Sequence, residues 1–251
     1  MARGTILTVI AAFLALSACT PLAWAIKIAK LGDSISMHMH DALVAAMPDD
    51  VVIHAGLYDL NYPYNNQGTK QWLRVDDGFT DHRFVRRLNE VRDRDLILAN
   101  VGIHNMRVED AYGTTPDLYE QHLNQIFDVF AQEDVPIVWV TTTPIPFDHP
   151  LILESRQEEY RQRELRVVNA RADVVVDAYT LLVDEFEERP WRIAHENLHL
   201  NDDGNQLVAQ AIADVVVGLK GAQLSVIPEA SSFLGCLGIA WGYALKRRRR
   251  V

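Results

Sequence analysis

A serine near the start of the chain has the surroundings of a nucleophile. Ser34 lies in the segment Gly32-Asp33-Ser34-Ile35-Ser36, which follows an apolar, β-branched run and precedes a predicted helix. A serine hydroxyl attacks well only when a base removes its proton, and the positive end of a helix stabilises the oxyanion that then forms. Taken alone, Ser34 would more often be a helix N-cap, so its function depends on what else the chain supplies.

A histidine near the other end of the chain is the candidate base. His199 ends the segment His195-Glu196-Asn197-Leu198-His199, on a predicted loop that enters the last helix. An imidazole on such a loop can face a cleft, and Glu196, three residues earlier, can orient the ring. A serine, a base and an acid need to meet only in space, so this set is compatible with a hydrolytic triad.

The same segment also spells H-E-x-x-H, the signature of zinc proteases. That motif requires a helix to bring both rings to one face. Pro190 upstream and a predicted cap at Asn201-Asp202 downstream leave little room for one. We therefore disfavour zinc, and we expect no metal and no cofactor. His38 and His40 are interpreted as surface or core residues of the first helix rather than as metal ligands.

Strand-like and helical segments alternate along the chain. The predicted strands are 26–31, 51–54, 95–100, 135–142 and 173–177. The predicted helices are 82–92, 116–133 with Leu118, His122, Ile126 and Phe130 in register, 154–171, and a last helix with i, i+4 apolar ridges over 207–219. This order indicates one α/β domain of the doubly wound, flavodoxin-like type, with a five-stranded parallel sheet in three layers, α/β/α. Ligands of such folds bind beyond the carboxyl ends of the strands.

The order of the motifs resembles that of the SGNH, or GDSL, hydrolase family. Ser34 follows the first strand in Gly-Asp-Ser, Gly102 follows the third strand, and His199 stands three residues after an acid and before the final helix. Segments 66–69 (Asn-Gln-Gly-Thr), 100–105 (Asn-Val-Gly-Ile-His-Asn) and 141–144 (Thr-Thr-Thr-Pro) resemble a bacterial subgroup. The resemblance spans about 27–217 and implies hydrolysis of esters.

The resemblance also implies roles for individual residues. Ser34 is the nucleophile and His199 the base, and the backbone N–H groups of Ser34 and Gly68 line an oxyanion hole. Gly68 is favoured over Gly56, because a glycine amide that approaches an oxyanion needs an open loop.

Two positions depart from the pattern of the family. The family usually has Gly-x-Asn-Asp after the third strand, with the asparagine amide as a further oxyanion donor, whereas this chain has His104 at that position. An imidazole N–H can donate, Asn105 or Asn100 can serve instead, and a histidine that simply packs at the strand end is the remaining alternative. Glu196 replaces the usual aspartate. It either orients His199 or faces solvent, which would leave a Ser-His dyad.

The first 25 residues are predicted to be a secretory signal peptide. Arg3 precedes an apolar run over 6–16 and then small residues. Ala23-Trp24-Ala25 fits cleavage before Ile26, while residues 16–19, Leu-Ser-Ala-Cys, resemble a bacterial lipobox. We favour the first site because Ile26 opens a strand directly.

Residues 226–251 are predicted to be a sorting tail. Pro228-Glu229 precedes 13 apolar residues, 233–245, and then Lys246 with four arginines. The apolar stretch is shorter than the ~20 residues that cross a bilayer comfortably, and the basic cluster would stay in the cytoplasm. The arrangement resembles the PEP-CTERM signal of Gram-negative bacteria, which an exosortase processes, although Ala230 stands where a second proline is usual. The alternative is a plain membrane anchor.

The segment between these ends, 26–225, is the expected hydrolase-like domain. The whole chain of 251 residues carries a net charge of −10, but 26–228 holds 18 basic and 33 acidic residues, a net of −15. An acidic body argues against binding to nucleic acid. Cys19 and Cys236 lie outside it, so it can form no internal disulfide.

These features predict an exported ester hydrolase in the envelope, on the surface or in the extracellular matrix of a Gram-negative-type bacterium. Ser34 would form an acyl-enzyme, and His199 would activate the water that hydrolyses it. The loop 58–67, with three tyrosines, is compatible with an O-acyl or acetyl ester of a carbohydrate. The expected partners are this substrate, signal peptidase, an exosortase, and the membrane through the C-terminal segment. The alternative is a protein that has lost turnover through the changes at His104 and Glu196 and binds an extracellular glycan.

Overall fold

The computed structural model describes residues 24–55, 68–107, 113–145, 154–183 and 198–224. The chain divides into two compact units, residues 1–213 and 214–251, and all the strands belong to the first. The predicted signal peptide up to residue 23, the tyrosine-containing loop 58–67 and the predicted sorting tail lie outside the described residues.

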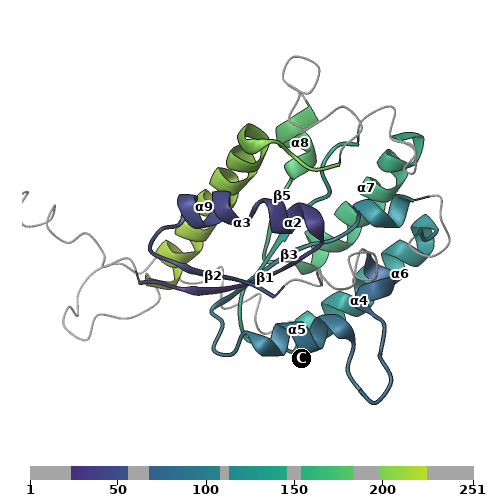
Figure 1. Ribbon diagram of the computed structural model, residues 1–251, viewed down its shortest axis with the longest axis horizontal. Helices are drawn as coiled ribbons and strands as arrows, with labels where there is room; N and C mark the ends of the chain where they lie inside the picture. Colours follow the sequence, from purple (N-terminus) through teal and green to yellow (C-terminus); the bar gives the residue numbers. More distant parts are fainter. Residues whose placement is uncertain (1–23, 56–67, 108–112, 146–153, 184–197, 225–251) are drawn as a thin grey trace, which may run out of the picture. The chain divides into compact units, whose positions relative to one another are not determined.

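Five parallel strands form one sheet, as the sequence predicts. They are β1 (Lys27–Gly32), β2 (Val51–His54), β3 (Leu96–Asn100), β4 (Ile137–Val140) and β5 (Val174–Val176). Their order in the sheet is β2-β1-β3-β4-β5, and every neighbouring pair is parallel. The register places Gly32 beside Asn100, so the carboxyl ends of β1 and β3 lie next to each other (Figure 1).

Helices connect the strands. The described helices are α2 (Ser34–His38), α3 (His40–Ala46), α4 (Thr69–Trp72), α5 (Arg83–Glu90), α6 (Pro116–Phe130), α7 (Glu154–Arg171), α8 (Ala178–Val183) and α9 (Asp202–Leu224), with a 3-10 turn η1 (Ile103–Met106). The helix predicted after the first strand is two short helices that meet at Met39. Asn201 caps α9 as predicted, because its Oδ1 accepts a hydrogen bond from Gly204 N at 2.9 Å.

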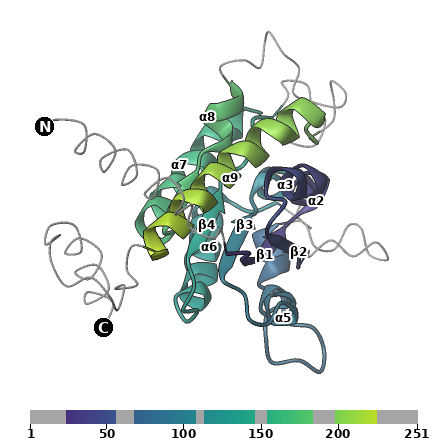
Figure 2. The ribbon, with the colours of Figure 1, turned by 90° about the vertical axis from the view of Figure 1, so that its left-hand side faces the viewer.

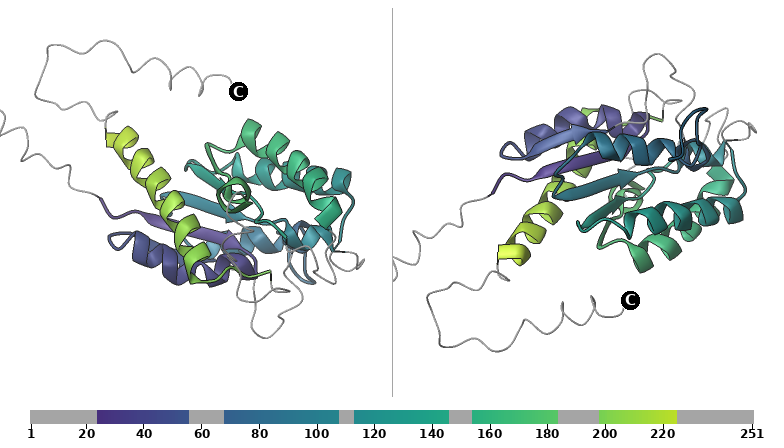
Figure 3. Two further views of the ribbon diagram at one scale, coloured as in Figure 1. Left: turned by 90° about the horizontal axis from the view of Figure 1, so that it is seen from above. Right: turned by 90° about the horizontal axis from the view of Figure 1, so that it is seen from below.

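The helices cover both faces of the sheet, and the layers can be followed in Figures 2 and 3. On one face, Leu98 and Val140 share a small cavity with side chains from α2, α3 and α9. On the other face, Ala29, Leu31, Ile97, Ala99 and Trp139 belong to one apolar core with side chains of α5, α6 and α7. Alternate residues of a strand point to opposite faces, so both sides of the sheet are buried. The predicted three-layer α/β/α fold is confirmed.

The buried face of α6 agrees with the predicted register at Ile126 and Phe130 but differs from it at the start of the helix. Leu118 is 38% exposed, whereas Tyr119 is buried. The hydroxyl group of Tyr119 donates to the carbonyl oxygen of Val101 at 3.1 Å, and its ring packs against Tyr160 of α7. An aromatic side chain that also satisfies a buried carbonyl group therefore turns the helix.

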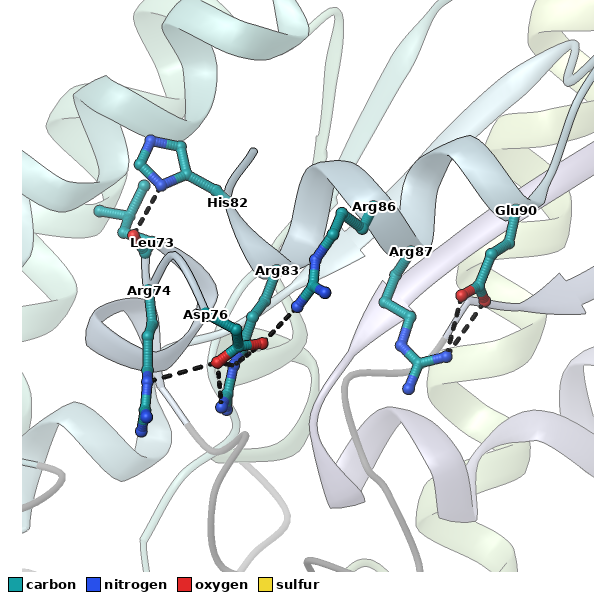
Figure 4. A network of polar contacts seen from close by, with 8 residues as sticks. All are labelled: Leu73, Arg74, Asp76, His82, Arg83, Arg86, Arg87 and Glu90. Carbon is teal, nitrogen blue, oxygen red and sulfur yellow. Dashed lines mark hydrogen bonds and ion pairs between the residues drawn. The ribbon is translucent and has the colours of Figure 1, made fainter. Parts of the chain in front are cut away.

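A cluster of arginines around Asp76 holds the connection between α4 and α5 (Figure 4). Asp76 accepts hydrogen bonds from Nε and Nη2 of Arg83 at 2.8 and 2.6 Å, and it also pairs with Arg74 and Arg86. These bonds, led by the one from Arg83, lower the pKa of Asp76. His82 contacts the carbonyl oxygen of Leu73 through its Nδ1 at 2.6 Å. The first part of this connection, from Leu73 to Asp76, is thus held against His82 and the first turns of α5.

Among the described residues, no helix has both the length and the apolar composition that spanning a membrane requires. The apolar stretch 233–245 lies outside them.

A buried carboxyl group lies within α7, a helix in which nine of the 18 residues are charged. The Oε1 atom of Glu164 accepts from the indole N–H of Trp139 at 2.8 Å, and its Oε2 accepts from the hydroxyl group of Thr142 at 3.1 Å. Burial raises the pKa of Glu164 to about 7, although these hydrogen bonds act in the opposite direction. The folded protein therefore favours the neutral form of Glu164.

Replacing Glu164 by glutamine is expected to reduce the pH dependence of stability. The folded-state pKa of Glu164 lies above its unfolded value, so its contribution is fully present below about pH 4.5 and is lost as the pH rises through about 7. Glutamine is neutral throughout this window. In urea unfolding, the wild type should lose on the order of 1–3 kcal/mol more than Glu164→Gln between pH 4.5 and 7.

Burial raises the pKa of Asp33 to about 6 and lowers that of His54 to about 3, and these two contributions have opposite signs. Both proteins share them, so the contribution of Glu164 is the difference between the two pH dependences. Equal slopes in the wild type and in Glu164→Gln would contradict the assignment to Glu164.

Candidate active site

Ser34 is the first residue of α2 and follows the carboxyl end of β1 (Figure 1). The preceding Asp33 is the N-cap, and its Oδ1 accepts from the backbone N–H of Ile35 at 3.0 Å. Asp33, not Ser34, therefore caps the helix, which leaves the Ser34 hydroxyl outside the capping bond. Ser34 is buried, with 6% of its surface exposed. A serine at this place is suited to nucleophilic attack if a base reaches it.

Hydrogen bonds hold the short helix α2 to the sheet. Lys30 of β1 is buried, and its ammonium group donates a hydrogen bond to the carbonyl oxygen of Ser36. Burial lowers the pKa of Lys30 to about 7, while the charge of Asp41 acts in the opposite direction. The Ser36 hydroxyl donates to Oδ1 of Asn100 at 3.4 Å. The turn that carries Ser34 thus has polar contacts with both β1 and β3.

His199 lies next to α2, the helix that begins with Ser34. Its imidazole packs against that of His38, with 4.2 Å between the ring centroids and 39° between the ring planes. His38 is the last residue of α2 and lies four residues after Ser34, so the two share one face of the helix. The structure therefore brings the predicted base to the helix that bears the predicted nucleophile.

The loop that carries Gly68 is tethered by Asn105. Gly68 has a φ of 139°, a conformation that favours glycine, and it immediately precedes α4. The Oδ1 atom of Asn105 accepts from the Thr69 N–H at 3.1 Å, and its Nδ2 donates to the hydroxyl groups of Thr69 and Thr114 at 2.7 and 3.1 Å. The Thr69 hydroxyl also contacts Nδ1 of His122 at 2.9 Å. Both N–H groups of the Asn105 amide are engaged, so Asn105 holds the loop instead of offering an oxyanion donor.

Asn100 is engaged in the same way. Its Nδ2 donates to the carbonyl oxygens of Val140 and Thr141 at 2.8 and 3.1 Å. This accounts for both of its amide hydrogens. Of the three side chains considered for the further oxyanion donor, His104 therefore remains as the candidate. His104 lies in η1 and is buried, with 4% exposed.

Gly102 brings the start of η1 close to α6 and β4. A Cβ atom at this residue would lie 2.4 Å from the Tyr119 hydroxyl oxygen and 2.4 Å from Cγ2 of Thr142. Both neighbours are buried, so neither can move away freely. Glycine at this position allows the close approach that places His104 and Asn105 near the strand ends.

Several predicted residues cannot be placed. Glu196, His195, Gly56 and the tyrosines of loop 58–67 lie outside the described residues, so the acid of the triad stays a prediction. Within the described part of the chain, no group of three or more His, Cys, Asp or Glu side chains could hold a metal ion.

Sequence reasoning did not identify the residues that position the site. Lys30, Thr69 and Thr114 act through contacts with segments that are distant in sequence. The motif at 66–69 drew attention to Gly68, but nothing in the sequence pairs Thr69 with Asn105. The contact of His38 with His199 was also not predicted.

The fold is that of several solved ester hydrolases. A lipase/acylhydrolase from Enterococcus faecalis is 18% identical with a TM-score of 0.58, over 77% of this chain and 96% of that one. An acetylxylan esterase from Geobacillus stearothermophilus is 14% identical with a TM-score of 0.56, over 76% and 94%. A protein from Parabacteroides merdae that is described as a GDSL-like lipase is 15% identical with a TM-score of 0.56, over 79% and 98%. No protein-family model and no curated protein sequence matches the chain. At these identities the likeness shows the fold.

Replacing Gly102 by alanine is expected to destabilise the protein by about 2 kcal/mol or more, because the added methyl group overlaps Thr142 and Tyr119. Gly218→Ala is the matched control. Gly218 lies inside α9, and among the described residues an added Cβ would have no neighbour within 4 Å apart from the backbone of the helix itself, so alanine should stabilise the helix by about 0.5–1 kcal/mol. Urea unfolding at 25 °C measures both changes. A Gly102→Ala protein as stable as the wild type would show that the close approach does not exist.

Proposed function

We propose that the protein is a serine hydrolase of the SGNH type that cleaves esters. One observation carries this proposal: Ser34 opens the helix after β1, and the ring of His199 packs against the last residue of that same helix. The likeness of fold to esterases and lipases supports the same class of reaction.

In the proposed reaction, His199 takes the proton of the Ser34 hydroxyl while the oxygen attacks the ester carbonyl carbon. The carbonyl π electrons move to its oxygen, which the backbone N–H groups of Ser34 and Gly68 and the ring N–H of His104 stabilise. Collapse expels the alcohol, which takes the proton from His199. Water then attacks the acyl-enzyme with His199 as base, and the acid leaves as Ser34 regains its proton. Glu196 is proposed to orient His199.

A carbohydrate O-acyl ester, with acetyl as the acyl group, is the proposed substrate. Support comes from a neighbour in fold that is described as an acetylxylan esterase. In two further structures of that enzyme, a serine or an aspartate is replaced by alanine, and each is called a catalytic mutant. A serine and an acid are also the residue types proposed here, with Glu196 in place of aspartate.

The purified full chain should hydrolyse p-nitrophenyl acetate and acetylated xylooligosaccharides without added metal. Ser34→Ala and His199→Ala should each lower kcat/KM about 10³-fold or more. His104→Leu should lower kcat about 10²-fold, since it removes one oxyanion donor. A chelator should have no effect.

Thr80→Ala and His82→Ala are the matched controls. Thr80 is exposed, and its hydroxyl donates to the neighbouring Asp81 at 3.4 Å, while His82 belongs to the α4–α5 connection. Both should keep the wild-type rate. A wild type no faster than Ser34→Ala on acetyl and longer acyl esters would reject the hydrolase and favour the glycan-binding alternative.

Export to the cell envelope is part of the proposal, with signal cleavage before Ile26. The backbone nitrogen of Ile26 donates to Oδ1 of Asp50 at 3.0 Å, and its carbonyl oxygen accepts from Val51 N at 2.9 Å. In a chain cut before Ile26, that nitrogen would be an ammonium group facing a carboxylate. The new terminus would thus keep its contacts at the start of β1.

The mass of the protein recovered from the periplasm or surface tests this site, because the mature chain should begin at Ile26. A lipid-modified chain that begins at Cys19 would reject it. Sorting of the C-terminal tail by an exosortase, or its use as a membrane anchor, is likewise proposed from the sequence alone. The same mass measurement detects loss of the tail.

A further inference from the structure

The backbone that follows His199 is held by hydrogen bonds, and the orientation of the imidazole depends in addition on contacts of the ring itself. The next residue, Leu200, is buried, and its carbonyl oxygen accepts from Nδ2 of Asn205 at 3.2 Å. Asn201 follows as the cap of α9. These contacts hold the backbone on the downstream side of His199. These backbone contacts do not set the two side-chain torsions that aim the imidazole. A general base works only if its nitrogen is aimed at the proton it takes.

The ring of His38 supplies such a contact. At 4.2 Å between centroids and 39° between planes, the two imidazoles are in contact in a tilted arrangement. His38 belongs to α2, so the group that touches the base and the group that is to be deprotonated are parts of one rigid turn. The turn itself is fixed to β1 and β3 through Ser36. Packing on His38 therefore fixes the position of the His199 ring relative to Ser34 as well as to its own loop.

We infer that His38 is a positioning residue of the active site, whose ring fixes the orientation of the His199 imidazole toward Ser34. This inference rests on the proposed function. His38 is exposed, as a residue at the edge of a site would be, and it acts by packing against the base. It is not assigned a proton-transfer step.

Replacement by alanine and by phenylalanine separates packing from the chemistry of the imidazole. His38→Ala removes the packed ring, so kcat for p-nitrophenyl acetate should fall about tenfold or more while KM stays within about twofold. His38→Phe keeps a flat ring of similar size and should restore kcat to within about threefold of the wild type. His82→Ala is the control, because His82 also stacks on another ring, that of Phe84, but in α5.

A double-mutant cycle tests whether His38 acts through His199. If it does, His38→Ala should cause no further loss in kcat when His199 is already alanine. A merely structural effect would add to the loss and would lower the midpoint of urea unfolding in parallel with kcat. An unchanged kcat in His38→Ala, a His38→Phe protein as slow as His38→Ala, or an additive cycle would overturn the inference.

Nuclear magnetic resonance of histidine Cε1–H groups decides the contact without any turnover. The chain has nine histidines, so single substitutions can assign the signals. The His199 signal should shift in His38→Ala and stay in place in His82→Ala. If the wild type shows no Ser34-dependent hydrolysis, the proposed function fails while this signal still reports the packing. A His199 signal that does not respond to His38→Ala overturns the inference in either case.

Discussion

One buried amide, that of Asn100, joins the three elements on which the candidate site depends. At the end of a parallel sheet the last carbonyl groups have no hydrogen-bond donor on the neighbouring strand. A buried polar group without a partner lowers the stability of the fold. Asn100 donates to the carbonyl oxygens of Val140, the last residue of β4, and of Thr141, and it accepts from Ser36 of α2. A five-residue helix is too short to be stable alone. The place of Ser34 is therefore set by the edge of the sheet, through Asn100 and Lys30.

Three buried ionisable groups near the carboxyl ends of the strands have pKa values shifted toward the neutral form. Burial lowers the pKa of Lys30 to about 7 and raises those of Asp33 and Glu164 to about 6 and 7, so each shift favours the neutral form. Such shifts indicate an interior that solvates charge poorly. In the same surroundings, N–H groups aimed at a developing oxyanion act more strongly than they would in water. The poor solvation of charge that keeps these three groups neutral thus also suits the chemistry proposed for Ser34.

The sequence was sufficient to predict the sheet and to select Ser34 and His199 as candidate site residues, which the structure brings to one helix. Strands flanked by helices on both sides are continuous runs of valine, isoleucine and leucine, which are easily recognised. Ser34 and His199 belong to short motifs whose order along the chain was informative. The roles of Asn100 and Asn105 could not be predicted, because the partners of an amide depend on which loop the fold places opposite it. The same applies to His38, which looked like an ordinary helix residue.

Two features of the core that the sequence did not reveal have a related cause. Leu118 was placed in the apolar stripe of α6, yet Tyr119 is the buried residue, since its hydroxyl group finds a carbonyl partner that no helical pattern reveals. Glu164 is one of many charged residues in α7, and its burial is compensated by hydrogen bonds from Trp139 and Thr142 across the layer. Periodicity predicts how an apolar face is arranged, but polar groups inside the core are selected by individual partners.

The arrangement of the site bears on the choice between an enzyme and a glycan-binding protein with the same fold. The fold alone does not decide, because one fold supports many functions and the solved neighbours are only 14–18% identical. A binding protein needs neither a serine at the start of a helix nor a base beside it. Here the ring of His199 packs on the helix that begins with Ser34, and the loop of Gly68 is tied down by an asparagine whose whole amide is used. Contacts that orient a base and an oxyanion loop matter for turnover and add little to the binding of a neutral sugar, so they favour the enzyme.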